Sequence, residues 1–395
     1  MSATAFAALP AQAVGPERIP NQYIVVLDKP ALPALLSRLG VDALAEAALV
    51  QVGGGQVLAR YSSAFTGFTA RLSESQAQAL AALPFVKLVE QDQLMMLVAT
   101  QNNPPSYGID RIDQRALPLS GSYIYANQGG AGAHVYVIDT GINANHTDFT
   151  GRVGTGRNFA TNSTGALCKN FNIGCAAPVA TNVTDCNGHG THVAGTAVGT
   201  TFGVAKKATV HAVRVFSCAG STATSTIISG VDWVTANRVL PAAANMSLGG
   251  SNSAALDSAV NAMINAGVSL AVAAGNSSSN ACTGSPNKVP RAITVGATTN
   301  TDAQASYSSF GPCLDIYAPG TNIVSAAYNS NTGSATLSGT SMASPHVAGA
   351  AALVLGANPS LSPDAVRDTI VGNATLGVIT GINATSPNAL LYTGN

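Results

Sequence analysis

The chain is poor in charged side chains. Asp, Glu, Lys and Arg make up 9% of its 395 residues, and 18 acidic residues balance 18 basic ones. Without basic runs it lacks the charge that holds phosphate backbones or anionic lipid surfaces, so we expect neither nucleic acid nor membranes as partners. No apolar run approaches the ~20 residues that a bilayer-spanning helix needs. The length exceeds what one core usually holds and predicts two domains.

Three separated segments place polar side chains beside apolar runs. VYVIDTGI predicts a buried strand that ends in Asp139, at the sheet edge where α/β proteins place ligands. NGHGTHVAGT sets His189 between glycines that let the backbone approach a cleft. GTSMASPHVAGAAALVL puts Ser341 at the start of an apolar helix, where unpaired amides favour negative charge. These are the residue types of nucleophilic acyl chemistry.

Each of these residues also has a plainer interpretation. Asp139 and Ser341 are ordinary helix or turn caps if their segments stand alone. His189 and His192 suggest zinc, but the spacing lacks the glutamate of HExxH and a third ligand is not evident. We therefore interpret His192 as a packed structural histidine. The three segments together outweigh these alternatives.

In their chain order, the segments resemble the aspartate, histidine and serine motifs of the subtilisin-like serine proteases. The flanks GIDRIDQRALPLSGSY, NMSLGG and AVAAGN are most similar to the secreted proteinase K and aqualysin branch, and the resemblance covers roughly residues 99–392. It implies a three-layer α/β subtilisin-like fold with a central, mostly parallel sheet. It also implies that His189 takes the proton of Ser341 and that Asp139 holds the imidazole in the required tautomer.

The resemblance extends to the oxyanion hole and the substrate cleft. Asn276 ends the apolar run GVSLAVAAGN, and its amide would be one oxyanion donor beside the Ser341 N–H; alone it would be a turn former. NMSLGG resembles the segment that pairs a peptide substrate as an added strand. The expected substrate contacts are Ser247, Leu248, Gly249 and Gly275, with Gly220 and Ser221 on the other wall. The glycines predict an open pocket with a broad, mainly apolar preference, and ordinary loop glycines are the alternative.

The sequence has six cysteines, and six allow many pairings. The resemblance implies two disulfides, Cys186 with Cys218 and Cys282 with Cys313. It leaves Cys168 and Cys175 as a third pair that would close a short local loop. An even number of cysteines in a chain similar to secreted hydrolases favours an oxidising compartment, and we expect secretion. The alternative is a cytosolic enzyme with reduced thiols and Cys186 free beside His189.

Residues 21–98 predict a separate small domain. QYIVVLDK predicts a strand, ALPALLSRLGVDALAEAAL a helix, and VLARYSSAFTGFTARL two strands joined by a turn. SESQAQALAAL predicts a helix capped by Ser73, and FVKLVEQD a last strand. This order suits a small α+β ferredoxin-like domain. It resembles the prodomain that assists folding and inhibits subtilisin-like proteases until it is cleaved; an accessory domain is the alternative.

The flanks of this domain bear on processing. Residues 1–20 are interpreted as a linker or signal-peptide remnant, because AFAALPAQA ends in an A-x-A pattern but lacks a basic start. The apolar stretch Leu94 to Val98 could lie in the cleft as a substrate does, and Ala99 resembles the mature start of the aqualysin-like enzymes. We expect self-cleavage near the Val98–Ala99 bond, with residues 99–395 as the peptidase domain.

The chemistry needs no cofactor, but the resemblance implies structural calcium. It puts Asp315 at a carboxylate ligand with the carbonyls of Pro290 and Ala292 beside it, all oxygen donors as Ca²⁺ prefers. A second, partial match consists of Asp110, Asp113 and Gln114, with Ser120 where relatives carry an aspartate. Solvated surface carboxylates are the alternative for both.

The sequence thus predicts a secreted, monomeric serine endopeptidase with peptide or protein substrates and its own prodomain as an intramolecular inhibitor. Two alternatives belong to other classes. A catalytically dead binding protein would lack a triad or oxyanion residue, and none is missing. An esterase would carry a GxSxG elbow and the order Ser, Asp, His, and neither is present.

Overall fold

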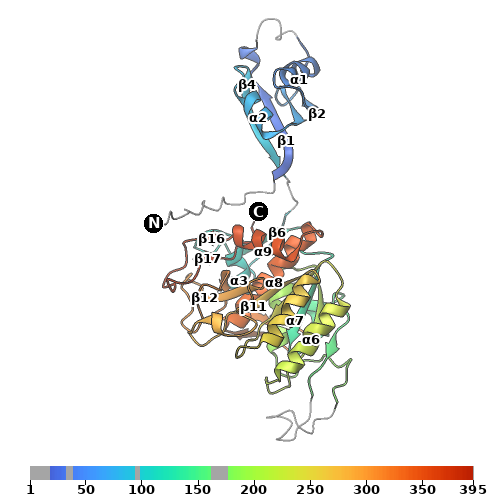
Figure 1. The fold of residues 1–395 in the computed structure, drawn as a ribbon, viewed down its shortest axis with the longest axis vertical. Coiled ribbons are helices and arrows are strands. Elements are labelled where there is room, and N and C mark those ends of the chain that lie inside the picture. The colour runs from blue at the N-terminus through green and yellow to red at the C-terminus, as the bar shows by residue number, and fades with distance from the viewer. Residues whose placement is uncertain (1–17, 33–38, 94–97, 162–176, 395) are drawn as a thin grey trace, which may run out of the picture. The chain divides into compact units, whose positions relative to one another are not determined.

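The computed structural model describes residues 18–32, 39–93, 98–161 and 177–394 (Figure 1). The chain divides into two compact units, one within Val14–Met96 and the other running from Leu97 to Asn395. Each unit has a hydrophobic core of its own.

The smaller unit is an antiparallel sheet covered by two helices. Its strands lie in the order β2-β3-β1-β4. The bounds are β1 Arg18–Leu27, β2 Gln56–Tyr61, β3 Gly67–Arg71 and β4 Val86–Gln93, with helices α1 Val41–Val50 and α2 Glu74–Ala81. Val25 and Leu27, two apart on β1, are buried with Leu49 of α1 and Leu80 of α2, because alternate strand residues face the same side. The predicted α+β order and the capping box at Ser73 are confirmed. The first helix was expected from Ala31, but α1 begins at Val41 after the N-cap Gly40.

The larger unit is built on a nine-stranded sheet of order β16-β17-β13-β12-β11-β10-β7-β9-β8. The strands are β7 His134–Asp139, β8 Arg157–Asn158, β9 Thr209–Arg214, β10 Ala242–Met246, β11 Val268–Ala273, β12 Ile293–Thr298, β13 Ile316–Pro319, β16 Thr375–Leu376 and β17 Ala389–Leu390. All neighbours pair in parallel except β16 with β17. Two hairpin-like pairs are β5 Val98–Asn102 with β6 Ser122–Ala126 and β14 Ile323–Ala326 with β15 Ser334–Leu337.

Helices cover both faces of this sheet (Figure 1). The helices are α3 Tyr107–Ile112, α5 His189–Val198, α6 Thr224–Asn237, α7 Ala254–Asn265, α8 Thr340–Ala357 and α9 Pro363–Gly372. Val135 and Val137 of β7 share a core with α5 and α8, whereas Tyr136 and Ile138 share the opposite core with α6 and α7. The run VYVI is apolar on both sides because the strand is covered on both faces. The expected three-layer α/β fold is confirmed.

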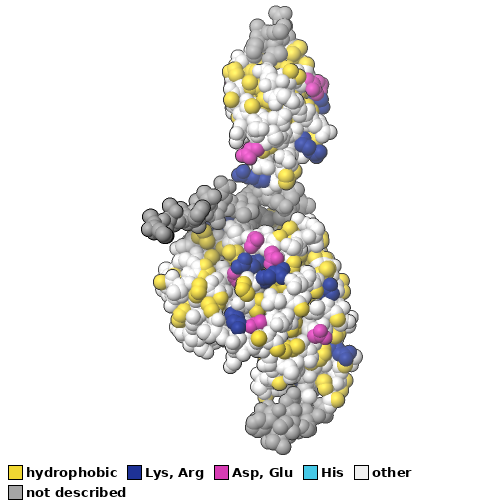
Figure 2. Space-filling view, viewed as in Figure 1, with side chains coloured by type: hydrophobic (Ala, Val, Ile, Leu, Met, Phe, Trp, Pro, Cys, Tyr) yellow, Lys and Arg dark blue, Asp and Glu magenta, His cyan; other side chains and the backbone are white. Residues whose placement is uncertain are grey.

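The surface carries little charge of a single sign. On the face shown in Figure 2, the blue and magenta side chains stand near one another in small groups. Ion pairs join opposite charges in the same way, as Arg60 does with Asp42 and Arg291 with Asp364. Within the described ranges, no helix is both long and apolar enough to cross a membrane.

Candidate active site

Asp139 and His189 meet at the carboxyl edge of the sheet. Asp139 is the last residue of β7 and is 1% exposed. Its two carboxylate oxygens lie 2.8 and 2.9 Å from His189 Nδ1, and Oδ1 also accepts a hydrogen bond from the Thr140 N–H at 2.7 Å. Burial lowers the pKa of His189, but the carboxylates of Asp139 and Asp185 raise it by more, so the net shift is upward. The pair holds one imidazole tautomer and stabilises the imidazolium.

The loop before His189 is organised by Asp185, which sequence reasoning missed. Its buried carboxylate accepts hydrogen bonds from the Thr140 and Thr191 hydroxyls at 2.9 and 2.6 Å and from the Gly188 N–H at 2.9 Å. Gly188 has φ 109°, which favours glycine. A Cβ on Gly190 would come within 2.2 Å of the Gly141 carbonyl oxygen, so glycine lets α5 begin against β7.

Ser341 lies in the first turn of α8. Its hydroxyl donates to the Ser247 carbonyl at 3.3 Å, and its own carbonyl accepts from the Ser247 hydroxyl at 2.8 Å. Among the described residues, Ser341 Oγ makes no hydrogen bond to His189. To reach the imidazole, the hydroxyl would have to turn away from Ser247.

Asn276 follows β11 through a glycine turn. Its Oδ1 accepts from the Thr340 N–H at 2.8 Å and from the Thr340 hydroxyl at 2.9 Å. These two contacts fix which end of the amide faces α8 and leave Nδ2 without an acceptor among the described residues. Thr340, which we did not predict, thus orients the proposed oxyanion donor.

A hollow of about 420 Å³ opens beside Asn276 and Ser341. Its lining is free of Asp, Glu, Lys and Arg, and includes the predicted Ser247, Leu248, Gly249 and Gly275. Gly220 and Ser221 are not part of it. They lie in a turn where Ser221 accepts from the Ser217 hydroxyl, and Cys218 of the same turn accepts from the Asn187 side chain at 3.1 Å.

Two disulfides flank the cleft, and both predicted pairings are confirmed. Cys186 is bonded to Cys218, and Cys282 to Cys313. The first bridge joins the segment before His189 to the turn that contains Gly220. Cys168 and Cys175 lie outside the described residues.

His192 packs behind the site, apart from the chemistry. It is fully buried, and its Nε2 lies 2.9 Å from the Ile323 carbonyl oxygen. His346 is also fully buried, with Nδ1 2.9 Å from the Met342 carbonyl oxygen. Burial lowers the pKa of each imidazole to about 4. In the described part of the chain, no group of three or more His, Cys, Asp or Glu side chains could hold a metal ion.

Asp315, the carboxylate expected to bind calcium, has partners in the protein. Asp315 Oδ2 accepts from the Thr294 N–H at 2.7 Å, and Oδ1 is paired with Arg367. Burial raises the pKa of Asp315, while the Thr294 amide and the guanidinium lower it by less. A carboxylate whose side chain is 9% exposed fits the donor chemistry of Ca²⁺, and Oδ1 would have to leave Arg367 to bind the ion.

In the second, partial calcium site, Ser120 donates hydrogen bonds to the Asp110 carboxylate. Ser120 donates from both N–H and Oγ to Asp110 Oδ1 at 3.1 Å, and its N–H also lies 2.8 Å from Gln114 Oε1. Burial, with the nearby Asp110 carboxylate, raises the pKa of Asp113 to about 6 against the lowering effect of the Ile124 N–H. Ser120 thus satisfies the carboxylate that a cation would otherwise bind.

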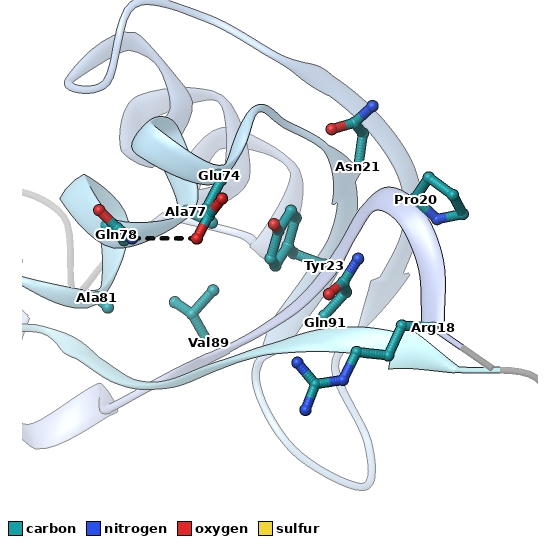
Figure 3. A pocket seen from close by; sticks show the side chains of 10 residues that line it. All are labelled: Arg18, Pro20, Asn21, Tyr23, Glu74, Ala77, Gln78, Ala81, Val89 and Gln91. Carbon is teal, nitrogen blue, oxygen red and sulfur yellow. Dashed lines mark hydrogen bonds between the residues drawn. The ribbon is translucent and has the colours of Figure 1, made fainter. Parts of the chain in front are cut away.

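The smaller unit has a hollow of its own, of about 470 Å³, between α2 and strands β1 and β4 (Figure 3). The small side chains of Ala77 and Ala81 open it, and Glu74 at its edge accepts from Gln78 at 3.4 Å. Its lining contains no serine, histidine or cysteine.

Two family models match this chain. The model described as Subtilase family matches residues 130–389, and that described as Peptidase inhibitor I9 matches residues 22–97. An "Extracellular serine proteinase" of Thermus sp. (strain Rt41A) is 47% identical over 390 residues, which cover 96% of this chain and 90% of the relative. "Alkaline serine exoprotease A" of Vibrio alginolyticus is 44% identical over 386 residues, 95% of this chain and 67% of the relative. A solved "cold adapted subtilisin-like serine proteinase" has a TM-score of 0.66 at 47% identity, covering 73% of this chain and 97% of its own.

Proposed function

The chain belongs to the subtilase family, and from this premise we propose that Asp139, His189 and Ser341 are its catalytic triad. The protein is a secreted, subtilisin-like serine endopeptidase made as a self-processing precursor with an inhibitor prodomain. Its chemistry requires no cofactor. The observation that carries the residue assignment is the buried Asp139 carboxylate, which holds His189 Nδ1 with both oxygens at 2.8 and 2.9 Å.

The proposed reaction assigns one role to each of these groups. His189 Nε2 accepts the proton of Ser341 as its oxygen attacks the scissile carbonyl, and Asp139 stabilises the imidazolium. The developing oxyanion takes hydrogen bonds from Asn276 Nδ2 and the Ser341 N–H. His189 returns the proton to the leaving amine, and the acyl-enzyme is hydrolysed by a water that His189 deprotonates.

The hollow beside Ser341 supports a broad, mainly apolar preference for the residue before the cut. Leu248, Ala273 and Ala274 supply apolar lining, and the absence of a charged side chain in it gives a charged substrate residue no compensation. Sequencing of the peptides released from a denatured protein mixture tests this. A strict requirement for Lys, Arg, Asp or Glu before the cut contradicts it.

Processing is proposed to divide the chain into prodomain 21–98 and peptidase 99–395. The inhibitor match ends at residue 97, next to the proposed Val98–Ala99 bond. As finer proposals, the mature enzyme is a monomer, and structural Ca²⁺ is held by Asp315 with the carbonyls of Pro290 and Ala292.

The decisive experiment removes one oxygen atom. Purified wild-type precursor is expected to lose its first part without added protease, whereas Ser341→Ala stays full-length, folded by circular dichroism and inactive on peptides. The matched control is Ser269→Ala, which truncates a buried serine whose hydroxyl has no partner among the described residues and should mature normally. If Ser341→Ala matures in a host that lacks other proteases, Ser341 is not the nucleophile.

A further inference from the structure

A proline within α8 leaves the carbonyl of Ser341 without its regular helical partner. In an α-helix the carbonyl of residue i accepts from the N–H of residue i+4. For Ser341 that residue is Pro345, which lies inside the helix and has no N–H. A buried carbonyl without a donor is costly, so this backbone oxygen needs another partner.

Ser247 supplies that partner from a different part of the chain. Its hydroxyl donates to the Ser341 carbonyl at 2.8 Å, across 94 residues of sequence. Ser247 follows β10 and is 6% exposed, in the segment proposed to pair with the substrate. The contact is reciprocal, because the Ser341 hydroxyl donates back to the Ser247 carbonyl at 3.3 Å.

Asn245 fixes the direction of the Ser247 hydroxyl. Its Nδ2 donates to Ser247 Oγ at 2.8 Å, and its Oδ1 accepts from the Ser344 hydroxyl at 2.7 Å. Asn245 and Ser344 are fully buried. Since a hydroxyl has one proton and Ser247 Oγ already accepts from Asn245, that proton is committed to the Ser341 carbonyl. Asn245 in turn is held in the centre of the sheet, opposite Ala271 of β11.

We propose that Ser247 is a positioning residue for the nucleophile, through a hydroxyl that replaces the helix hydrogen bond missing at Pro345. The inference rests on the proposed role of Ser341. It joins the first turn of α8 to the segment proposed to pair with the substrate. The position of the attacking oxygen is thereby fixed relative to the scissile carbonyl. The hydroxyl of Ser341 remains free to turn, while the backbone that carries it does not.

Truncation of this hydroxyl should affect turnover more than substrate binding. The substrate would pair with backbone groups, which Ser247→Ala retains, so KM should stay within about two-fold. Loss of one hydrogen bond to the nucleophile's backbone should lower kcat roughly ten-fold. Ser247→Thr keeps the hydroxyl and should restore kcat to within about three-fold of wild type. Ser269→Ala serves as the matched control and should leave both constants unchanged.

The double-mutant cycle with Pro345→Ala separates positioning from general packing. An alanine restores the N–H that the Ser341 carbonyl lacks, so in this background Ser247→Ala should cost less than about two-fold in kcat. All variants are produced as full-length precursors. The concentration of active sites is measured by titration with a fluorophosphonate, and kcat is calculated per active site. A merely structural role would lower thermal stability in both backgrounds without this coupling.

Three outcomes overturn the proposal: an unchanged kcat for Ser247→Ala, an equal loss in both backgrounds, or a Ser247→Thr variant as slow as Ser247→Ala. If Pro345→Ala fails to fold, the proposal is tested by comparing the kcat of Ser247→Ala with that of Ser247→Thr. Turnover near the wild-type rate by Ser341→Ala would instead refute the nucleophile assignment, so the two failures are distinguishable.

Discussion

Acid should destabilise the peptidase unit through His346. The imidazole is fully buried, and its Nε2 has no hydrogen-bond partner among the described residues. Burial lowers the pKa of His346 from 6.5 to about 4. The unfolded chain therefore binds this proton first as the pH falls, and the folded state loses stability from about pH 6.5 down to about pH 4.

The size of this loss follows from the pKa shift. One unit of pKa corresponds to about 1.4 kcal/mol, so the full shift amounts to about 3 kcal/mol below pH 4. At pH 5 the unfolded imidazole is mostly protonated and the buried one mostly neutral, which gives a loss of about 2 kcal/mol. Other groups contribute as well. His192 acts in the same direction, whereas the raised pKa values of Asp113 and His189 favour the folded state at low pH.

A non-titrating variant isolates the contribution of His346. His346→Asn keeps an N–H near the Met342 carbonyl but cannot be protonated. Unfolding by denaturant is followed at pH 8 and pH 5 in the Ser341→Ala background, which prevents self-digestion. The only tryptophan, Trp233 of α6, reports on the peptidase unit alone. The stability lost between the two pH values should be about 2 kcal/mol smaller in His346→Asn. An equal loss with and without the histidine refutes the reasoning.

Three further expectations can be checked on the same enzyme. Asn276→Ala should lower kcat by about 100- to 1000-fold, the cost measured for this type of donor in a subtilisin, with little change in KM in steady-state peptide hydrolysis; an unchanged rate excludes it from the oxyanion hole. Replacing Cys186 and Cys218 by serine should lower the free energy of unfolding by about 2 to 5 kcal/mol, measured by tryptophan fluorescence, and a smaller loss would mean that the bridge does little for stability. Excess chelator should lower the melting temperature in calorimetry, and Asp315→Asn should remove most of that response; no response in the wild-type protein means that Ca²⁺ is not bound there.

The sequence predicted those parts of the fold and site that depend on local pattern. The apolar run before Asp139 indicated a strand covered on both faces, and β7 is such a strand. The glycines around His189 indicated a close approach of backbones, which Gly190 makes. The capping box at Ser73 was also predictable, because its partners are three residues apart.

What could not be predicted depends on contacts between distant segments. Asp185 reads as an ordinary loop residue until folding brings Thr140, 45 residues away, to its carboxylate. Thr340 contacts Asn276 across 64 residues, and Asp315 is paired with Arg367 across 52. No periodicity or spacing rule encodes such pairs, because the sheet order that creates them is itself a property of the whole unit.

The pairing of β5 with β6 places the proposed cleavage bond within a β-ladder of the larger unit. Val98 lies opposite Ala126 and Ala99 opposite Tyr125, so both sides of the proposed cleavage bond belong to one ladder. Val98, expected to lie in the cleft, is therefore on this ladder in the structure. For the proposed cut, the segment would have to leave β6 before it could lie extended beside Ser341. The same strand is anchored by Gln101, whose side chain donates to the Thr201 carbonyl at 3.0 Å. If the bond is cut as proposed, the backbone hydrogen bonds to β6 would hold the new amino end and oppose its return to the acyl-enzyme.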